Sequence, residues 1–344
     1  MSPITQSLIL SSLAAGTIIT MSSQSWITIW AGLELNTLAI LPIISKNHHP
    51  RATEATTKYF LTQAAASAMI LMASTLNAWH TGQWDITQLT TSPAPTLLTM
   101  ALAMKLGLAP THFWLPEVLQ GTTLMTALLI TTWQKLAPMA VLMMAHNNLQ
   151  PSLLLMLGLA SALWGGWAGL NQTQLRKIMA YSSIAHLGWI IAAASMSPPI
   201  TLLMLWVYIL LTTAMFTSMA TLYLKTVKDL STAWTLSPGL VALLLLTLLS
   251  LAGLPPLTGF LPKWLILQEL TTHRLTAIAA LFAAFSLLSL YFYLRLSYTS
   301  AITLHPTPTP TKNKWRQSRH KYTKLISPLT PINTAAIPLI PTML

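Results

Sequence analysis

Long apolar segments alternate with short polar ones along most of this 344-residue chain. A helix of about 20 apolar residues can cross a bilayer, and hydropathy over that length predicts roughly eleven spans. We expect them near residues 3–22, 25–45, 57–79, 95–118, 122–146, 150–170, 175–196, 199–224, 238–270, 275–298 and 323–342. Prolines crowd the last segment, so a helix lying on the membrane surface is an alternative there.

Two of these spans carry the same interruption. The fourth contains KLGLAPTHFWLPE from Lys105, and the ninth contains GLPPLTGFLPK from Gly253, with glycine and proline at matching spacings. Proline removes a helix donor and clashes with the preceding turn, so both spans are predicted to break. Broken backbone at membrane depth survives where protein or a water-filled cavity satisfies it, and paired broken helices typify transporter ion paths. Two unrelated loops at helix ends are the alternative interpretation.

The position of the breaks predicts an internal repeat. Each break falls in the fourth helix of a group of five, which divides the chain into residues 1–146, 150–298 and 299–344. An odd number of helices in each group would insert the second group upside down relative to the first. The expected fold is therefore an all-α polytopic membrane protein with about eleven transmembrane helices. It would consist of two inverted five-helix repeats, each with a discontinuous helix, followed by a basic loop and a C-terminal helix.

Composition supports the membrane class and excludes several kinds of chemistry. The chain is 53% hydrophobic and 7% charged, with a mean hydropathy of +0.61, whereas a soluble protein is about 25% charged. It contains no cysteine, which excludes disulfides, thiolate zinc sites and iron–sulfur ligation by this chain. The N-terminal segment MSPITQSLIL lacks a signal or transit pattern, so we expect the spans themselves to direct insertion.

The net charge of +12 follows the predicted topology. Nearly all basic residues outside the spans fall on one side, and the other side receives only Arg274. The first group comprises Lys46, Arg51, Lys58, Arg176, Lys177, Lys225, Lys228, Arg295 and the basic residues from Lys312 to Lys324. The positive-inside rule then places the N-terminus on the inner side. The basic tail is expected to flank a membrane; lipid or RNA binding is the alternative.

Five titratable residues remain within the predicted spans, at similar depth. They are Glu34, Lys105, Lys135, His186 and Lys263. A lysine or acid at the centre of a membrane helix costs roughly 2.5–3.5 kcal/mol on insertion scales. Because such a cost has no benefit for folding, these residues favour a function, and a lateral proton relay with water between the groups suits lysine and histidine chemistry.

Structural explanations remain for each charged position. A lysine near a helix end can extend its amine to the interface, and Glu34 with Lys105 would also make an ion pair that fixes helix packing. His112 lies in the first break and either joins the relay or packs as a hydrogen-bonded histidine. Glu117 and Glu269 are expected to be interfacial carboxylates. The histidines show no metal-ligand spacing, and phosphate loops, dinucleotide fingerprints and nucleophile arrangements do not occur.

Several motifs resemble a known family. They are GLELNTLAI around Glu34, MKLGLAPTHFWLPEV from Met104, WQKLAP around Lys135, GLNQTQLRKIMAYSSIAHLGW from Gly169 and GLPPLTGFLPKW from Gly253. Together they are similar to the antiporter-like, proton-pumping subunits of mitochondrial NADH:ubiquinone oxidoreductase (respiratory complex I), and among these to the vertebrate subunit 2 family. The likeness covers the chain to about residue 300.

The resemblance implies proton translocation across the inner mitochondrial membrane, driven by electron transfer from NADH to ubiquinone in other subunits. It implies Glu34 and Lys105 as a charged pair, Lys135 as a central lysine, and Lys263 and His186 as further relay residues. It also implies no cofactor, NADH site or redox centre in this chain, membrane-arm subunits and lipid as partners, and a matrix-side N-terminus. A freestanding cation/proton antiporter and a purely structural membrane-arm subunit are the alternatives.

Overall fold

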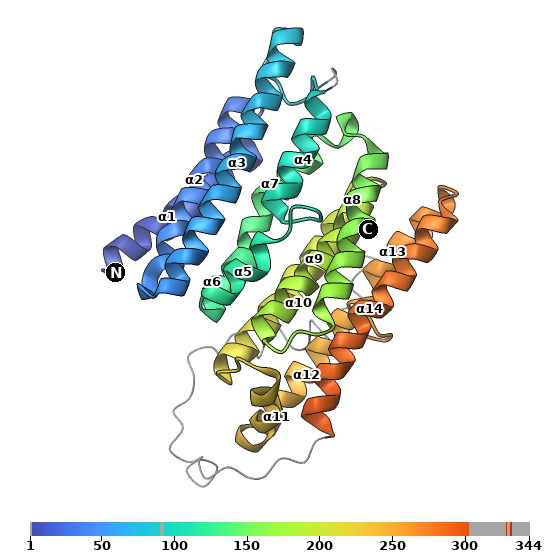
Figure 1. Ribbon diagram of the computed structural model, residues 1–344. Coiled ribbons are helices and arrows are strands. Elements are labelled where there is room, and N and C mark those ends of the chain that lie inside the picture. Colours follow the sequence, from blue (N-terminus) through green and yellow to red (C-terminus); the bar gives the residue numbers. More distant parts are fainter. Residues whose placement is uncertain (1, 90–92, 303–327, 329–330, 332–344) are drawn as a thin grey trace. The chain divides into compact units, whose positions relative to one another are not determined.

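The protein is described by a computed structural model that covers residues 2–89, 93–302, 328 and 331. In this part of the chain the regular elements are helices joined by short loops, which confirms the predicted all-α class (Figure 1). Seven helical segments are long and apolar enough to cross a membrane, and Ala94–Leu106 and Pro238–Ala252 are shorter apolar helices. The predicted helix at 323–342 and most of the basic loop lie outside the described residues.

The chain divides into two compact units. Unit 1 comprises Met1–Ser161 and Ala194–Pro198, and unit 2 comprises Ala162–Ala193 and Pro199–Leu344. The boundary falls within one long helix, α8 (Pro151–Gly169). The inverted repeats expected over residues 1–146 and 150–298 remain a prediction.

Unit 1 begins with three long helices that pack side by side (Figure 1). The unit contains α1 (Pro3–Ser22), α2 (Trp26–Ile44), α3 (Pro50–Thr81), α4 (Ala94–Leu106), α5 (Trp114–Gly121), α6 (Leu124–Thr131), α7 (Trp133–Met144) and the first part of α8. The predicted fourth span is thus two helices, α4 and α5, separated at the expected break.

Two glycines bring α1 and α2 unusually close. A Cβ atom at Gly32 would lie 2.6 Å from Thr20 Cγ2, and a Cβ atom at Gly16 would lie 3.0 Å from the Gly32 carbonyl oxygen. Small residues at such crossings let backbones approach, which supplies van der Waals packing where lipid provides no hydrophobic driving force between helices. The contact fixes α2, the helix that carries Glu34 and Asn36.

The predicted fifth span is present but is interrupted, which the sequence interpretation missed. Helix α6 ends at Thr131 and α7 begins at Trp133, with Thr132 at φ −110° and ψ −70° between them. The Thr132 hydroxyl donates a 2.7 Å hydrogen bond to the Leu128 carbonyl, a back-bonding contact that bends helices. Leu124–Met144 still forms one apolar span, and Lys135 lies near its middle as expected, in the first turn of α7.

Unit 2 contains the second broken span and one helix that hydropathy did not predict. Its elements are the second part of α8, α9 (Leu175–Ala194), α10 (Pro198–Thr221), α11 (Val227–Leu236), α12 (Pro238–Ala252), α13 (Phe260–Thr272) and α14 (Thr276–Ala301). The short helix α11 starts with a capping box between Thr226 and Asp229, a threonine and an acid three residues apart that is readable in the sequence. The predicted ninth span forms two half-helices, α12 and α13.

Candidate functional site

The break in unit 1 ends α4 and places Lys105 in its last turn. Gly107 follows with φ +78°, a left-handed conformation that favours glycine. The Gly107 amide donates to the Ala103 carbonyl at 2.9 Å, and the Leu108 amide donates to the same oxygen at 2.9 Å, as in a Schellman cap. The link to α5 contains a cis peptide bond between Ala109 and Pro110.

Side chains from two other helices donate to carbonyls at the end of α4. The indole Nε1 of Trp114, in α5, donates to the Met104 carbonyl at 3.1 Å. The ε-amino group of Lys135, in α7, donates to the Leu106 carbonyl. The last carbonyls of a helix lack intrahelical partners and carry partial negative charge, so they suit an ammonium group. Lys135 therefore acts as a cationic cap on the broken helix.

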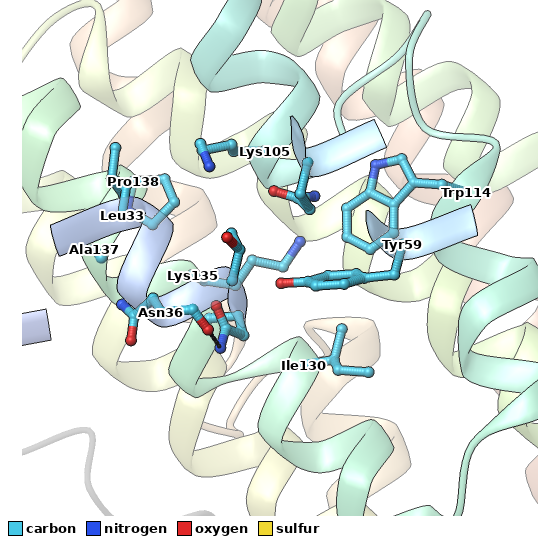
Figure 2. A pocket seen from close by; sticks show the side chains of 12 residues that line it. Leu33, Asn36, Tyr59, Lys105, Trp114, Ile130, Lys135, Ala137 and Pro138 are labelled. Atoms are coloured by element: carbon cyan, nitrogen blue, oxygen red, sulfur yellow. Dashed lines mark hydrogen bonds between the residues drawn. The ribbon is translucent and has the colours of Figure 1, made fainter. Parts of the chain in front are cut away.

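Lys105 and Lys135 both line one small pocket in unit 1 (Figure 2). Both side chains are buried, with 4% and 1% of their surfaces exposed. The Lys135 amine lies 6.0 Å from the centroid of the Trp114 ring, and Trp114 packs edge-to-face on Tyr59 with ring centroids 5.6 Å apart. An aromatic face stabilises a nearby cation, so the pocket offers Lys135 both a ring and a carbonyl.

Glu34 does not form the expected ion pair with Lys105. In the described part of the chain the ion pairs within 4.0 Å join Lys58 to Glu54, Lys58 to Glu117 and His273 to Glu269. One carboxylate oxygen of Glu34 and the amine of Lys105 are both buried without a hydrogen-bond partner. The charged pair predicted from the sequence is thus open in this structure.

The break in unit 2 places a lysine on a helix end in the same manner. Helix α12 ends at Ala252, and Gly253 follows it with φ +82°. The link contains a cis peptide bond between Pro255 and Pro256. The ε-amino group of Lys263, in the first turn of α13, donates to the Ala252 carbonyl at 3.0 Å. Its chain passes so close to Gly253 that a Cβ atom there would lie 3.1 Å from Lys263 Cδ and Nζ.

His186 in α9 takes the neighbouring carbonyl of the same helix end. Its Nε2 lies 3.2 Å from the Leu251 carbonyl oxygen, and its Nδ1 lies 2.8 Å from the Ser182 carbonyl oxygen. A neutral imidazole carries one N–H, whereas both partners are acceptors. A neutral ring can donate to only one of the two carbonyls at a time, whereas a doubly protonated ring donates to both.

In both units a lysine amine donates to a carbonyl at the end of the first half of the broken helix, but the lysine comes from a different helix in each unit. In unit 1 the amine that caps the broken helix comes from Lys135 on α7, and in unit 2 it comes from Lys263 on α13. Among the described residues no group of three or more His, Asp or Glu side chains is arranged to hold a metal ion. The chemistry that this arrangement supports is reversible protonation of buried amines and an imidazole.

Comparison with known proteins decides the family. The sequence profile described as "NADH:quinone oxidoreductase/Mrp antiporter, TM" matches residues 23–289, and the profile "NADH dehydrogenase subunit 2 C-terminus" matches residues 290–344. The chain is 56% identical to the NADH-ubiquinone oxidoreductase chain 2 of Varanus timorensis, with all of both chains covered. The chain belongs to the NADH-ubiquinone oxidoreductase chain 2 family. A second member of this family, from Struthio camelus, is 55% identical to this chain. That alignment covers 100% of this chain and 99% of the Struthio camelus chain.

A solved structure supports the fold expected of the chain 2 family. A chain of "Respiratory complex I from Thermus thermophilus with bound Aureothin" superposes with a TM-score of 0.87 at 27% sequence identity. The superposition covers 97% of this chain and 78% of that chain. The superposition therefore supports the antiporter-like fold that the family resemblance implies.

The remaining predicted residues of this chain 2 family member lie outside the two capped helix ends. His112 is buried in the first break and stacks on Phe113, with ring centroids 4.4 Å apart. Glu117 is exposed on α5, where its carboxylate accepts from Lys58 of α3 at 2.6 Å. Glu269 is half-buried near the end of α13, 3.8 Å from His273. The interfacial position expected of the two glutamates remains a prediction.

Sequence reasoning missed two uncharged residues of the site. Asn36 on α2 and Gln63 on α3 line the same pocket as the two lysines of unit 1, and both are buried. The sequence does mark both positions, because a carboxamide in the middle of an apolar span needs a hydrogen-bond partner inside the protein. A search confined to charged residues passes over them.

Proposed function

We propose that this chain is a proton-translocating membrane-arm subunit of an NADH:ubiquinone oxidoreductase in the inner mitochondrial membrane. The observation that carries the proposal is the pair of buried lysine amines held on the carbonyl ends of broken helices. Helix ends of this kind coordinate protons and cations in transporters that alternate access around a fixed site. Membership of the chain 2 family supports coupling to electron transfer in other subunits.

The geometry suggests how an amine exchanges protons here. The carbonyl end of a half-helix stabilises an ammonium, whereas apolar surroundings penalise any buried charge. Because these opposing effects are both large, a modest movement of the helix end changes which charge state is favoured. Moving one charge through 100 mV requires about 2.3 kcal/mol, which is comparable to the effect of forming or breaking one close charge contact.

The relay is proposed to run laterally from Lys105 through Lys135 and His186 to Lys263, with a branch at His112. Opening and closing of the Glu34–Lys105 contact is the proposed switch. The open separation of the two groups supports this, because their buried atoms have no other hydrogen-bond partners. A neighbouring membrane-arm subunit would control the switch.

The chemical roles outside the relay follow from the family. Electrons would pass from NADH to ubiquinone in other subunits, and this chain would hold neither NADH nor a redox centre. Its partners would be membrane-arm subunits on both sides and lipid. The basic residues would face the matrix together with the N-terminus, as the positive-inside rule requires.

The decisive experiment replaces Lys105 or Lys135 with methionine in the assembled complex and measures proton translocation alongside NADH oxidation. Methionine keeps much of the apolar chain and removes the exchangeable proton, so we expect both rates to fall by at least about tenfold. Normal coupled activity in both assembled variants would refute the relay. Loss of assembly without a pumping defect in any assembled variant would favour a structural role.

A freestanding cation/proton antiporter is tested separately. If the isolated chain in liposomes exchanged sodium for protons at the rate of the intact complex, the subunit proposal would fail. We expect no such activity, because the proposed switch needs a neighbouring subunit.

A further inference from the structure

Carboxamides and a phenol share the pocket of Lys105 and Lys135. Asn36 comes from α2, whereas Tyr59 and Gln63 come from α3, where they lie one helical turn apart. Figure 2 shows the Tyr59 hydroxyl directed into the pocket. None of these three residues is charged at neutral pH, so an account of the site that considers only ionised groups leaves them without a role.

The polar atoms around this pocket are unpaired to an unusual degree. Both polar atoms of the Asn36 carboxamide, Nε2 of Gln63 and Nζ of Lys105 are buried with no hydrogen-bond partner among the described residues. The side chains of Asn36 and Gln63 are 2% and 3% exposed. Buried polar groups are almost always satisfied by protein or by ordered water. Convergence of several such groups on one cavity therefore indicates a bound polar molecule.

The size of the cavity limits what that molecule is. The pocket leaves about 10 Å³ in which the centre of a water molecule can lie. About 10–15 Å³ on this measure is the least that holds one water, which needs two to four polar partners. The lining supplies those partners, because the amine of Lys105 donates and the carboxamides of Asn36 and Gln63 both donate and accept. A larger polar ligand does not fit this volume.

We infer that Asn36 and Gln63 are positioning residues that hold a water molecule between Lys105 and Lys135. The inference rests on the proposed proton relay and adds a specific site to it. A carboxamide both donates and accepts, so it keeps its hydrogen bond to the water whether the neighbouring lysine is charged or neutral. A carboxylate in its place would pair with one lysine and hold that lysine in its charged state. Neutral amides therefore suit a position through which a proton passes.

Gln63 is the better of the two residues to replace. Asn36 Oδ1 would lie 3.0 Å from a Cβ atom at Gly16, so Asn36 also contributes to the close α1–α2 contact. Gln63→Leu keeps a similar volume and removes every hydrogen bond to the water. Ser74→Ala is the matched control, because Ser74 is buried on the same helix and its hydroxyl donates only to the Leu71 carbonyl within α3. Ser74 does not line the pocket.

The test uses the assembled complex in proteoliposomes. We expect Gln63→Leu to lower proton-coupled NADH oxidation by roughly three- to tenfold, the change that loss of one hydrogen bond in a rate-limiting path produces. The solvent deuterium isotope effect on this rate should rise, and the apparent KM for ubiquinone should stay unchanged. Gln63→Asn should restore part of the rate, because a shorter amide still binds water. Ser74→Ala should match the wild type in every measurement.

A high-resolution density map of the wild-type complex gives an independent readout that does not require any variant to assemble. Density for a water within hydrogen-bond distance of Gln63 Nε2 and Lys105 Nζ, lost in Gln63→Leu, would support the inference. A dry pocket, density with the short, many-oxygen coordination of a metal cation, or wild-type coupling in Gln63→Leu would overturn it. If Gln63→Leu is normal while Lys105→Met is inactive, the relay survives and only the water-holding role fails.

Discussion

The ε-amino group of Lys263 donates a 3.0 Å hydrogen bond to the carbonyl oxygen of Ala252, the last residue of the helix that breaks in unit 2. In this half-helix the adjacent carbonyl, from Leu251, faces His186. The chain thus places two protonatable side chains on consecutive carbonyls of one helix end. In unit 1 the corresponding position, Leu106, accepts from Lys135. The broken helices supply acceptors for protonated side chains, which explains why their ends are irregular at membrane depth.

Gly253→Ala should impair the complex by disturbing Lys263. An alanine at φ +82° costs about 1–2 kcal/mol, because its Cβ atom clashes in a left-handed conformation. That Cβ would also lie 3.1 Å from the Lys263 amine, which must then shift away from Ala252. We expect lower proton translocation in the complex that assembles. Gly239→Ala is the control, because a Cβ atom there meets nothing within 4 Å. Equal activity of the two variants would show that the Lys263 position does not matter.

His186→Leu should lower coupled NADH oxidation by about tenfold, as expected when a positioned proton-transfer group is removed. His186→Gln should retain more activity, because its amide still donates to one of the two carbonyls that His186 contacts. Ser289→Ala serves as the control, since Ser289 is buried and its hydroxyl donates within α14 to the Ser286 carbonyl. Proton uptake measured with a pH-sensitive dye separates the relay from packing. Wild-type coupled NADH oxidation in the assembled His186→Leu variant would contradict a proton-transfer role for the imidazole.

Glu117→Gln should leave proton translocation within about twofold of the wild type. The Glu117 carboxylate is exposed and pairs with Lys58, and exposed ion pairs contribute little to stability because water and salt screen them. Any effect should appear as a small loss of thermal stability that vanishes at high salt. Lys58→Gln, which removes the same pair from the lysine side, checks this interpretation and should also leave proton translocation within about twofold of the wild type. A loss of pumping as severe as that of Lys135→Met would instead add Glu117 to the relay.

Single-cysteine labelling should reveal the orientation of the chain. The sequence contains no cysteine, so Lys228→Cys and Arg274→Cys each introduce one thiol at an exposed position. In mitoplasts, a membrane-impermeant maleimide should label the cysteine at 274 directly and the cysteine at 228 only after permeabilisation. The reverse pattern would contradict the positive-inside assignment of the N-terminus to the matrix.

The sequence alone determined the class of the protein and the location of the breaks. Apolar segments long enough to cross a bilayer and a charged content of 7% leave only a polytopic membrane protein. Proline and glycine act within their own turn of the helix, so the breaks after Lys105 and before Lys263 were readable as local patterns. The interruption at Thr132 was not, because threonine back-bonding depends on how neighbouring helices constrain the bend.

Only the tertiary structure decided which groups meet. Lys135 is 29 residues from Leu106, and His186 is 65 residues from Leu251, and no periodicity relates positions so far apart on different helices. The tertiary structure also revealed that Glu34 and Lys105 do not form an ion pair. It further showed that Asn36 and Gln63 line the pocket of Lys105 and Lys135. Hydropathy counts the cost of each polar side chain separately, whereas hydrogen bonding depends on pairs of atoms from different helices, and folding alone determines those pairs.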